Sequence, residues 1–247
     1  MTPAEPAVSL RSVTVSYREH VALHDVSLDI RHGDFCGIIG PNGAGKTTLL
    51  TVINGLGRIH SGTVNILGER TTRANFGRLR RHIGYVAQQE RIDPRAPISC
   101  LEAVLVGACG RAGLFRRLTA LDRERARAMM ELTRTSHLAE RPAGRISGGE
   151  ARKIALARAL VQEPGILLLD EPTSNLDPRA VREFGELVVD AYRRFSLTIV
   201  MVTHQLDHLP LVANRITMLK NGRVTYSGDR TALNDGHLIA ELFADAA

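Results

Sequence analysis

The sequence predicts an α/β fold with a mostly parallel sheet, a β-rich N-terminal part and a helical insertion. Two short apolar runs, FCGIIG (residues 35–40) and GILLLDEP (residues 165–172), are typical of strands that are buried on both faces of a sheet. Helical patterns separate these strands along the chain, which favours a parallel arrangement. The 247 residues, 44% of them hydrophobic, suit one large α/β domain or two small ones.

The first third of the chain shows mainly strand patterns. Apolar and polar residues alternate in two early segments, and a glycine-rich loop follows the first continuous apolar run. The predicted elements in this part are strands at residues 8–17, 24–30 and 35–40, a helix over about 47–56, and strands at 61–69 and 82–88, the last ending at Gln88.

The rest of the chain alternates between helical and strand patterns. From residue 89 to 145 the pattern is helical, with turns at prolines, and a further helix follows Ser147. We then expect a strand at 165–172, a helix over about 179–195, a strand at 197–204 and a hairpin that turns at Asn221-Gly222.

Charge and composition exclude several classes of protein. The net charge is +6, but acidic residues lie among the arginines and aromatic residues make up only 4%, so no nucleic-acid partner is expected. We find no apolar run of 18 residues and no N-terminal secretory signal, so we expect the chain to stay in the cytoplasm unless a partner holds it at a membrane.

Three cysteines without CxxC spacing are expected to be reduced core thiols.

A phosphate-binding loop is predicted between the strand at 35–40 and the following helix. The segment GPNGAGKT fits the pattern GxxxxGK[ST], in the strand–loop–helix context that this pattern requires. Glycines free backbone N–H groups for phosphate oxygens, Lys46 would reach the β- and γ-phosphates, and Thr47 would offer its hydroxyl to Mg²⁺. The residues expected to bind the nucleotide here are Gly40, Pro41, Asn42, Gly43, Ala44, Gly45, Lys46, Thr47 and Thr48.

Two carboxylates follow the second buried strand. Asp170 and Glu171 lie at its carboxyl end, where ligands bind in open α/β sheets. We expect Asp170 to hold Mg²⁺ and Glu171 to orient or deprotonate the attacking water. His204 ends the next strand and would reach a γ-phosphate.

A second anion site is predicted at the turn that opens the helix after residue 147. Ser147 is a good helix cap, and Gly148 and Gly149 allow a close backbone approach. The first turn of a helix presents free N–H groups and a partial positive charge, which suit an anion. We call Ser147, Gly148 and Gly149 the signature turn.

These motifs together resemble those of ABC-type ATPases. The phosphate loop, Gln88, ISGGE, ILLLDE, SNLD and His204 have the order and spacing of that family, and the resemblance covers nearly the whole chain. It implies a P-loop NTPase core with a mostly parallel sheet, an N-terminal antiparallel β part and a helical subdomain. The implied division is a single domain, 1–247, with 1–88 and 147–247 as the core and 89–146 as the helical subdomain.

The resemblance also implies a role for several residues and a set of partners. The signature turn, with Glu150, would close on ATP held by the phosphate loop of a second copy, in a head-to-tail homodimer. Tyr17 would stack on adenine, Gln88 would contact Mg²⁺ and water and relay this to a membrane permease, and Asp177 would couple the two sites. The dimer would lie on the cytoplasmic face of the inner membrane, as a peripheral subunit linked through the permease to an extracytoplasmic substrate-binding protein.

The chain departs from the usual family pattern at a few positions, none of which removes a catalytic group. Ile146 replaces Leu, Glu150 replaces Gln, Lys153 replaces Arg, Ala87 replaces Pro and Asn175 replaces a small residue.

Residues 92–126 resemble the corresponding region of ATPases that serve importers of manganese, zinc or ferrous iron. Importers of siderophores or cobalamin are similar but often carry GRxPH where this chain has GRAGLF. There are three alternative hypotheses for the function: a soluble ABC ATPase of iron–sulfur cluster assembly, an exporter, and a nucleotide-gated DNA-binding protein. The last normally has a long coiled coil between the motifs, and residues 48–145 contain no sustained heptads.

Overall fold

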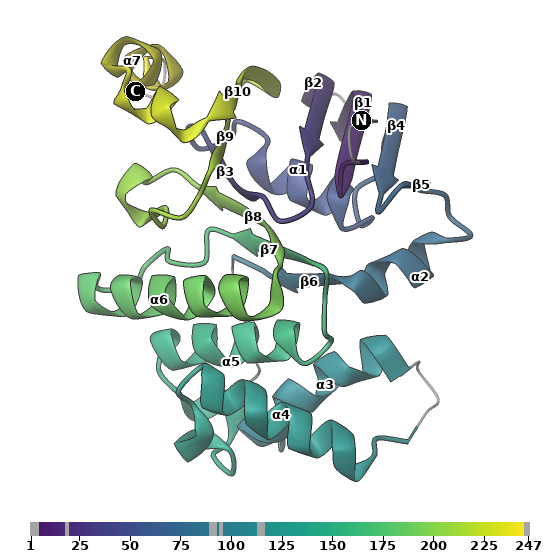
Figure 1. The fold of residues 1–247 in the computed structure, drawn as a ribbon, viewed down its shortest axis with the longest axis vertical. Helices are drawn as coiled ribbons and strands as arrows, with labels where there is room; N and C mark the ends of the chain where they lie inside the picture. The colour runs from purple at the N-terminus through teal and green to yellow at the C-terminus, as the bar shows by residue number, and fades with distance from the viewer. Residues whose placement is uncertain (1–4, 18–19, 89–92, 94–95, 113–116, 245–247) are drawn as a thin grey trace.

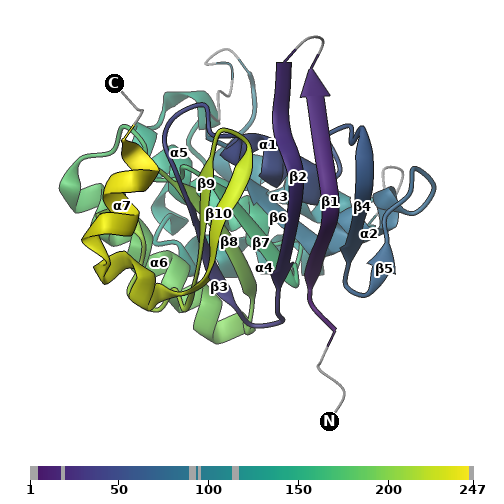
Figure 2. The same ribbon diagram turned by 90° about the horizontal axis from the view of Figure 1, so that it is seen from above.

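The computed structural model describes residues 5–17, 20–88, 93, 96–112 and 117–244. Two sheets and a set of helices make up this part of the chain (Figure 1). A four-stranded sheet has the order β2-β1-β4-β5, and a six-stranded sheet has the order β10-β9-β3-β8-β7-β6. Figure 2 shows the four-stranded sheet beside the six-stranded one, with α1 (Lys46–Ile53) close to both.

The antiparallel N-terminal sheet is confirmed. Its strands are β1 (Val8–Tyr17), β2 (His20–Ile30), β4 (Ser61–Ile66) and β5 (Glu69–Arg70), and all their pairings are antiparallel. The prediction of one strand over residues 61–69 was wrong. Leu67 and Gly68 both have positive φ, 52° and 78°, so the chain turns there and separates β4 from β5.

The larger sheet is mostly parallel, as predicted. Its strands are β3 (Phe35–Ile39), β6 (Ile83–Val86), β7 (Ile166–Asp170), β8 (Thr198–Thr203), β9 (Arg215–Lys220) and β10 (Arg223–Asp229). Only the β9–β10 hairpin is antiparallel among the described pairings, and its turn residues Asn221 and Gly222 have φ of 49° and 72°. Every residue of β3, β7 and β8 is buried, which explains their continuous apolar sequences. The strand predicted to reach Gln88 ends at Val86, where its pairing with β7 ends.

Helices cover the six-stranded sheet on both faces. One buried cluster contains α1 and residues of the antiparallel sheet, and a second contains α5 (Gly148–Leu160) and α6 (Pro178–Phe195) on the opposite face. Helix α1 begins one residue earlier than predicted and ends at Ile53 rather than residue 56, because Gly55, with φ of 68°, terminates it. Two helices were not predicted: the short α2 (Phe76–Leu79) and the C-terminal α7 (Gly236–Phe243).

A third buried cluster lies between α3 (Cys100–Ala112), α4 (Ala120–Leu132) and one side of α5. Helix α5 therefore packs on the sheet and on α3 and α4 at the same time, as Figure 1 shows. Residues 113–116, part of the segment that resembles metal importers, lie outside the described residues. In the part of the chain that the structure describes, no helix combines the length and the apolar character needed to cross a membrane.

Candidate functional site

The phosphate loop joins β3 to α1 in a conformation that needs glycine. Gly43 and Gly45 have φ of 79° and 98°, in the left-handed region that favours glycine. A Cβ on Gly40 would lie 2.0 Å from the carbonyl oxygen of Leu219, and one on Gly45 would lie 2.5 Å from that of Ala22. The backbone of the loop therefore packs closely on neighbouring strands at these two positions.

Lys46 is buried beneath this loop. Its side chain is 5% exposed, and its ammonium donates hydrogen bonds of 2.9 Å to the carbonyl oxygens of Gly40 and Pro41. It also lies 3.7 Å from the carboxylate of Glu171. Burial lowers the pKa of Lys46, and the charge and hydrogen bond of Glu171 oppose that shift. The ammonium is thus held in the loop, close to the end of β7.

Asp170 is hydrogen-bonded from two sides at the end of β7. The hydroxyl of Thr47 donates to one carboxylate oxygen at 3.1 Å, and the hydroxyl of Tyr85, on β6, donates to the other at 3.2 Å. Burial raises the pKa of Asp170, and these two hydrogen bonds oppose the shift. A hydroxyl and a carboxylate are the hard oxygen donors that Mg²⁺ prefers, so Thr47 and Asp170, two of the three expected Mg²⁺ ligands, fit the ion, whereas the amide of the third, Gln88, donates to Glu171.

Glu171 is the centre of the polar contacts at this end of the sheet. Its carboxylate accepts a hydrogen bond of 2.9 Å from the amide of Gln88, lies 3.2 Å from Nδ1 of His204, and faces Lys46. Its backbone has a φ of 43°, an uncommon left-handed conformation for a non-glycine residue, and its N–H donates to the carbonyl of Val202. The structure thus brings together Gln88, His204, Lys46 and Glu171, whose catalytic roles stay a prediction.

A cavity of ≈ 440 Å³ is lined by the signature turn, and a separate one of ≈ 320 Å³ is lined by the phosphate loop. The phosphate-loop cavity also contains Tyr17, His20, Ala22, Gln88 and Glu171 in its wall. Tyr17 is 49% exposed there, which leaves its ring accessible at the cavity. Asp170 and His204 do not line this cavity but contact residues that do, namely Thr47 and Glu171.

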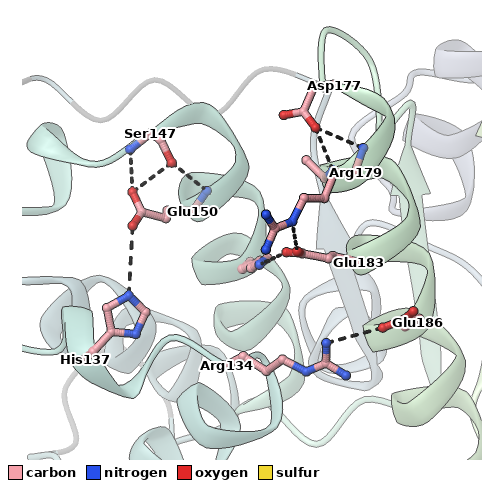
Figure 3. A network of polar contacts seen from close by, with 10 residues as sticks. Arg134, His137, Ser147, Glu150, Asp177, Arg179, Glu183 and Glu186 are labelled. Atoms are coloured by element: carbon pink, nitrogen blue, oxygen red, sulfur yellow. Dashed lines mark hydrogen bonds and ion pairs between the residues drawn. The ribbon is translucent and has the colours of Figure 1, made fainter.

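The signature turn is stabilised by a capping box. Ser147 accepts a hydrogen bond from the backbone N–H of Glu150, and the Glu150 carboxylate accepts from the backbone N–H and hydroxyl of Ser147 at 2.8 Å (Figure 3). These hydrogen bonds lower the pKa of Glu150. Glu150, a departure from the family pattern, therefore orders the start of α5. A Cβ on Gly148 would meet no atom within 4 Å, so this turn is open to an approaching ligand.

Asp177 caps the neighbouring helix α6. Its carboxylate accepts from the backbone N–H groups of Arg179 and Ala180 at 2.9 and 3.0 Å, which lowers its pKa (Figure 3). The signature cavity also contains Asn175, Asp177 and Glu183 in its wall. Asp177 thus lies beside the signature turn, and its visible contacts are those of a helix cap.

The two cavities have no lining residue in common. Within one chain, Ser147 is not brought to the loop that contains Lys46. Within one chain the signature turn and the phosphate loop thus line separate cavities, and the action of the signature turn on a second copy stays a prediction.

The sequence patterns did not predict a part in this region for three polar residues. They are His20 in the phosphate-loop cavity, Tyr85 on Asp170, and Arg152, which donates to the backbone carbonyls of Ala87 and Gln88. In the sequence Arg152 is only a charged residue within the helix predicted after Ser147, and this does not indicate its hydrogen-bond partners.

Known proteins resemble this chain in sequence and in fold. Residues 23–174 match the family model described as ABC transporter. The chain is 36% identical to "Phosphonates import ATP-binding protein PhnC" of Maricaulis maris, over 97% of this chain and 94% of that protein. A structure described as an inward-facing conformation of a putative metal-chelate type ABC transporter superposes with a TM-score of 0.83 and 26% identity, over 97% of this chain and 89% of that one.

A dimeric ATP-binding cassette in a post-hydrolysis state, bound to ADP and Pi, superposes with a TM-score of 0.80 and 29% identity, over 90% of this chain and 98% of that one. The family match spans more than half of the chain and includes both the phosphate loop and the Asp170–Glu171 pair. The chain belongs to the ABC transporter family, and it is an ATP-binding subunit that hydrolyses ATP with Mg²⁺ as cofactor.

Proposed function

We propose that this chain drives solute import, with its phosphate-loop residues and Glu171 acting on ATP that is closed in by the signature turn of a second copy. The observation that supports this most is the clustering of Lys46, Gln88 and His204 around the Glu171 carboxylate. This cluster lies beside a loop in which Gly43 and Gly45 have left-handed backbone conformations. Such a cluster can accept a proton from a water molecule and hold that water in line with a phosphate.

Each residue of the cluster has a distinct task in this proposal. Lys46 binds the β- and γ-phosphates, Glu171 orients or deprotonates the attacking water, and His204 holds Glu171 and reaches the γ-phosphate. Thr47 and Asp170 would hold Mg²⁺, which would neutralise phosphate charge when bound with ATP. Gln88 responds to the position of Glu171 through their 2.9 Å hydrogen bond and passes this change on toward the permease.

ABC subunits of this kind work as dimers with membrane permease subunits, and the chain is a peripheral subunit at the membrane. We propose that residues 89–146 form the helical subdomain that faces the permease, with 1–88 and 147–247 as the core. Helices α3, α4 and α5 share one buried cluster, and α5 begins at the signature turn. This packing supports a mechanical connection between the permease-facing helices and the signature turn.

The substrate proposed here is a metal ion or a metal chelate. Residues 92–126 support it by their likeness to metal-importer ATPases, and the described metal-chelate transporter is one of the similar structures. Phosphonate import is the second candidate, because a relative that is 36% identical over nearly the whole chain carries that name. Neither substrate is expected to bind this subunit, so the test is made on uptake.

Uptake can be measured in cells whose own copy of the chain is replaced by Glu171→Gln. We expect loss of uptake of manganese, zinc or ferrous iron, with phosphonate uptake unchanged. Loss of phosphonate uptake alone would contradict the metal proposal and support the second candidate. Purification of the wild-type chain from detergent-solubilised membranes is the companion experiment: we expect an integral membrane partner, whereas soluble partners alone would contradict transport.

A further inference from the structure

Arg152 connects the signature helix to the segment that carries Gln88. It lies on α5, five residues after the Ser147 cap, and is 9% exposed. Its guanidinium donates a 2.6 Å hydrogen bond to the carbonyl oxygen of Ala87 and a second to that of Gln88. We propose that Arg152 is a positioning residue that holds Gln88 against Glu171 and transmits the movement of the signature turn to it.

The backbone around Gln88 needs such support. The paired part of β6 ends with Val86 opposite Leu169, so Ala87 and Gln88 extend beyond the ladder. A guanidinium presents its N–H groups in a rigid planar fork, which suits two neighbouring carbonyl oxygens. Arg152 thus fixes two successive peptide groups of the segment from which the Gln88 side chain reaches Glu171.

Helix α5 is suited to carry a displacement from the Ser147 cap to Arg152. Five residues of α-helix span about 7.5 Å, and the residues of α5 are packed on the sheet on one side and on α3 and α4 on the other. A helix buried in this way moves as a rigid element rather than bending locally. When a ligand engages the signature turn, the shift of α5 therefore reaches Gln88 through Arg152.

This inference rests on the role proposed for Gln88, so the experiment tests both separately. A double-mutant cycle on the full-length chain compares kcat for ATP hydrolysis in the wild type, Gln88→Ala, Arg152→Gln and the double variant, at saturating MgATP. Arg127→Gln, an exposed arginine on α4, is the matched control for the loss of one positive charge on a helix.

We expect Arg152→Gln to lower kcat about tenfold in the wild-type background and less than about twofold in the Gln88→Ala background, because both changes remove the same contact with Glu171. Arg152→Lys keeps the charge but loses the fork, and we expect an intermediate kcat. Arg127→Gln should leave kcat unchanged in both backgrounds.

An equal fall of kcat in both backgrounds would overturn the inference, because Arg152 would then act independently of Gln88. An unchanged kcat in Arg152→Gln would overturn it as well. An unchanged kcat in Gln88→Ala alone would refute the role proposed for Gln88 and, with it, this inference. Thermal unfolding is recorded for every variant, and Arg152→Lys replaces Arg152→Gln in the cycle if the latter shows no cooperative transition.

Discussion

The hydroxyl of Thr47 donates a 3.1 Å hydrogen bond to the carboxylate of Asp170 and joins the phosphate loop to the end of β7. The second carboxylate oxygen is held by Tyr85 from the neighbouring strand β6. The side chain that is expected to hold Mg²⁺ is therefore oriented before the ion arrives, by residues on both sides of it.

Tyr85→Phe should weaken the response to Mg²⁺. The substitution keeps the ring and removes a hydrogen bond to a carboxylate, which contributes about 1.5 kcal/mol or more, or roughly a tenfold change in an equilibrium constant. We expect a rise of about tenfold in the Mg²⁺ concentration that gives half-maximal ATPase activity at saturating ATP. The Mg²⁺-dependent rise in melting temperature should move to higher concentrations as well. Unchanged titrations by both measures would show that Tyr85 does not orient Asp170.

Glu171→Gln should stop turnover while ATP still binds. Loss of a general base costs about 10²- to 10⁴-fold in rate, and the glutamine preserves the shape of the site. We therefore expect ATP to stabilise a closed dimer, seen by size-exclusion chromatography with light scattering. Glu186→Gln, an exposed carboxylate on α6, is the control and should hydrolyse ATP at the wild-type rate. Full activity of the Glu171→Gln protein would refute the role of Glu171.

Asp177→Ala should destabilise the fold through the loss of a helix cap. Removing an aspartate cap costs typically about 1 kcal/mol, and Asp177 accepts two backbone N–H groups of α6. Asp177→Asn retains an acceptor oxygen and should lose much less. Urea unfolding of the two variants measures the contribution of the helix cap to stability. ATPase assays of the same variants measure whether Asp177 also couples the two sites. If Asp177→Asn is as stable as the wild type but loses activity, Asp177 also couples the two sites.

Glu183 should make stability depend on pH in the acid range. The Lys153 ammonium and the Arg179 guanidinium hold the pKa of its carboxyl at about 2, against an ordinary value of 4.5. Between these values the unfolded chain binds more protons than the folded one, so the free energy of unfolding falls as pH falls. The Glu183 side chain is partly exposed, so solvent screening reduces the contribution of its ion pairs to stability.

The measurement is the melting temperature of wild type and Glu183→Gln from pH 6 down to pH 2. We expect the difference between the two proteins to be largest above pH 4.5 and to shrink toward pH 2. A difference that stays constant with pH would mean that the ion pairs with Glu183 do not stabilise the protein.

The main strands and the loop-borne motifs could be predicted because their signals are local. A continuous apolar run such as residues 166–169 defines a buried strand, and the carboxylates that follow it must lie at its carboxyl end. Tyr85 and Arg152 could not be predicted from such signals, because their hydrogen bonds depend on how β6 packs beside β7 and how α5 packs on the sheet.

The role of Asp177 as a cap could have been predicted. An aspartate directly before Pro178 at the first helical position is a signal for a helix start. The C-terminal helix α7 is only eight residues long, and periodicity over so short a segment is ambiguous. The break between β4 and β5 depends on a left-handed Leu67, a conformation that the residue type does not indicate.

The separation of the two cavities has a consequence for genetics. In the proposed dimer each chain contributes the phosphate loop to one site and the signature turn to the other, so a chain altered at Ser147 would impair a site that it shares with an unaltered chain. We expect such an allele, expressed beside the normal one, to behave as a dominant inhibitor rather than as a silent loss.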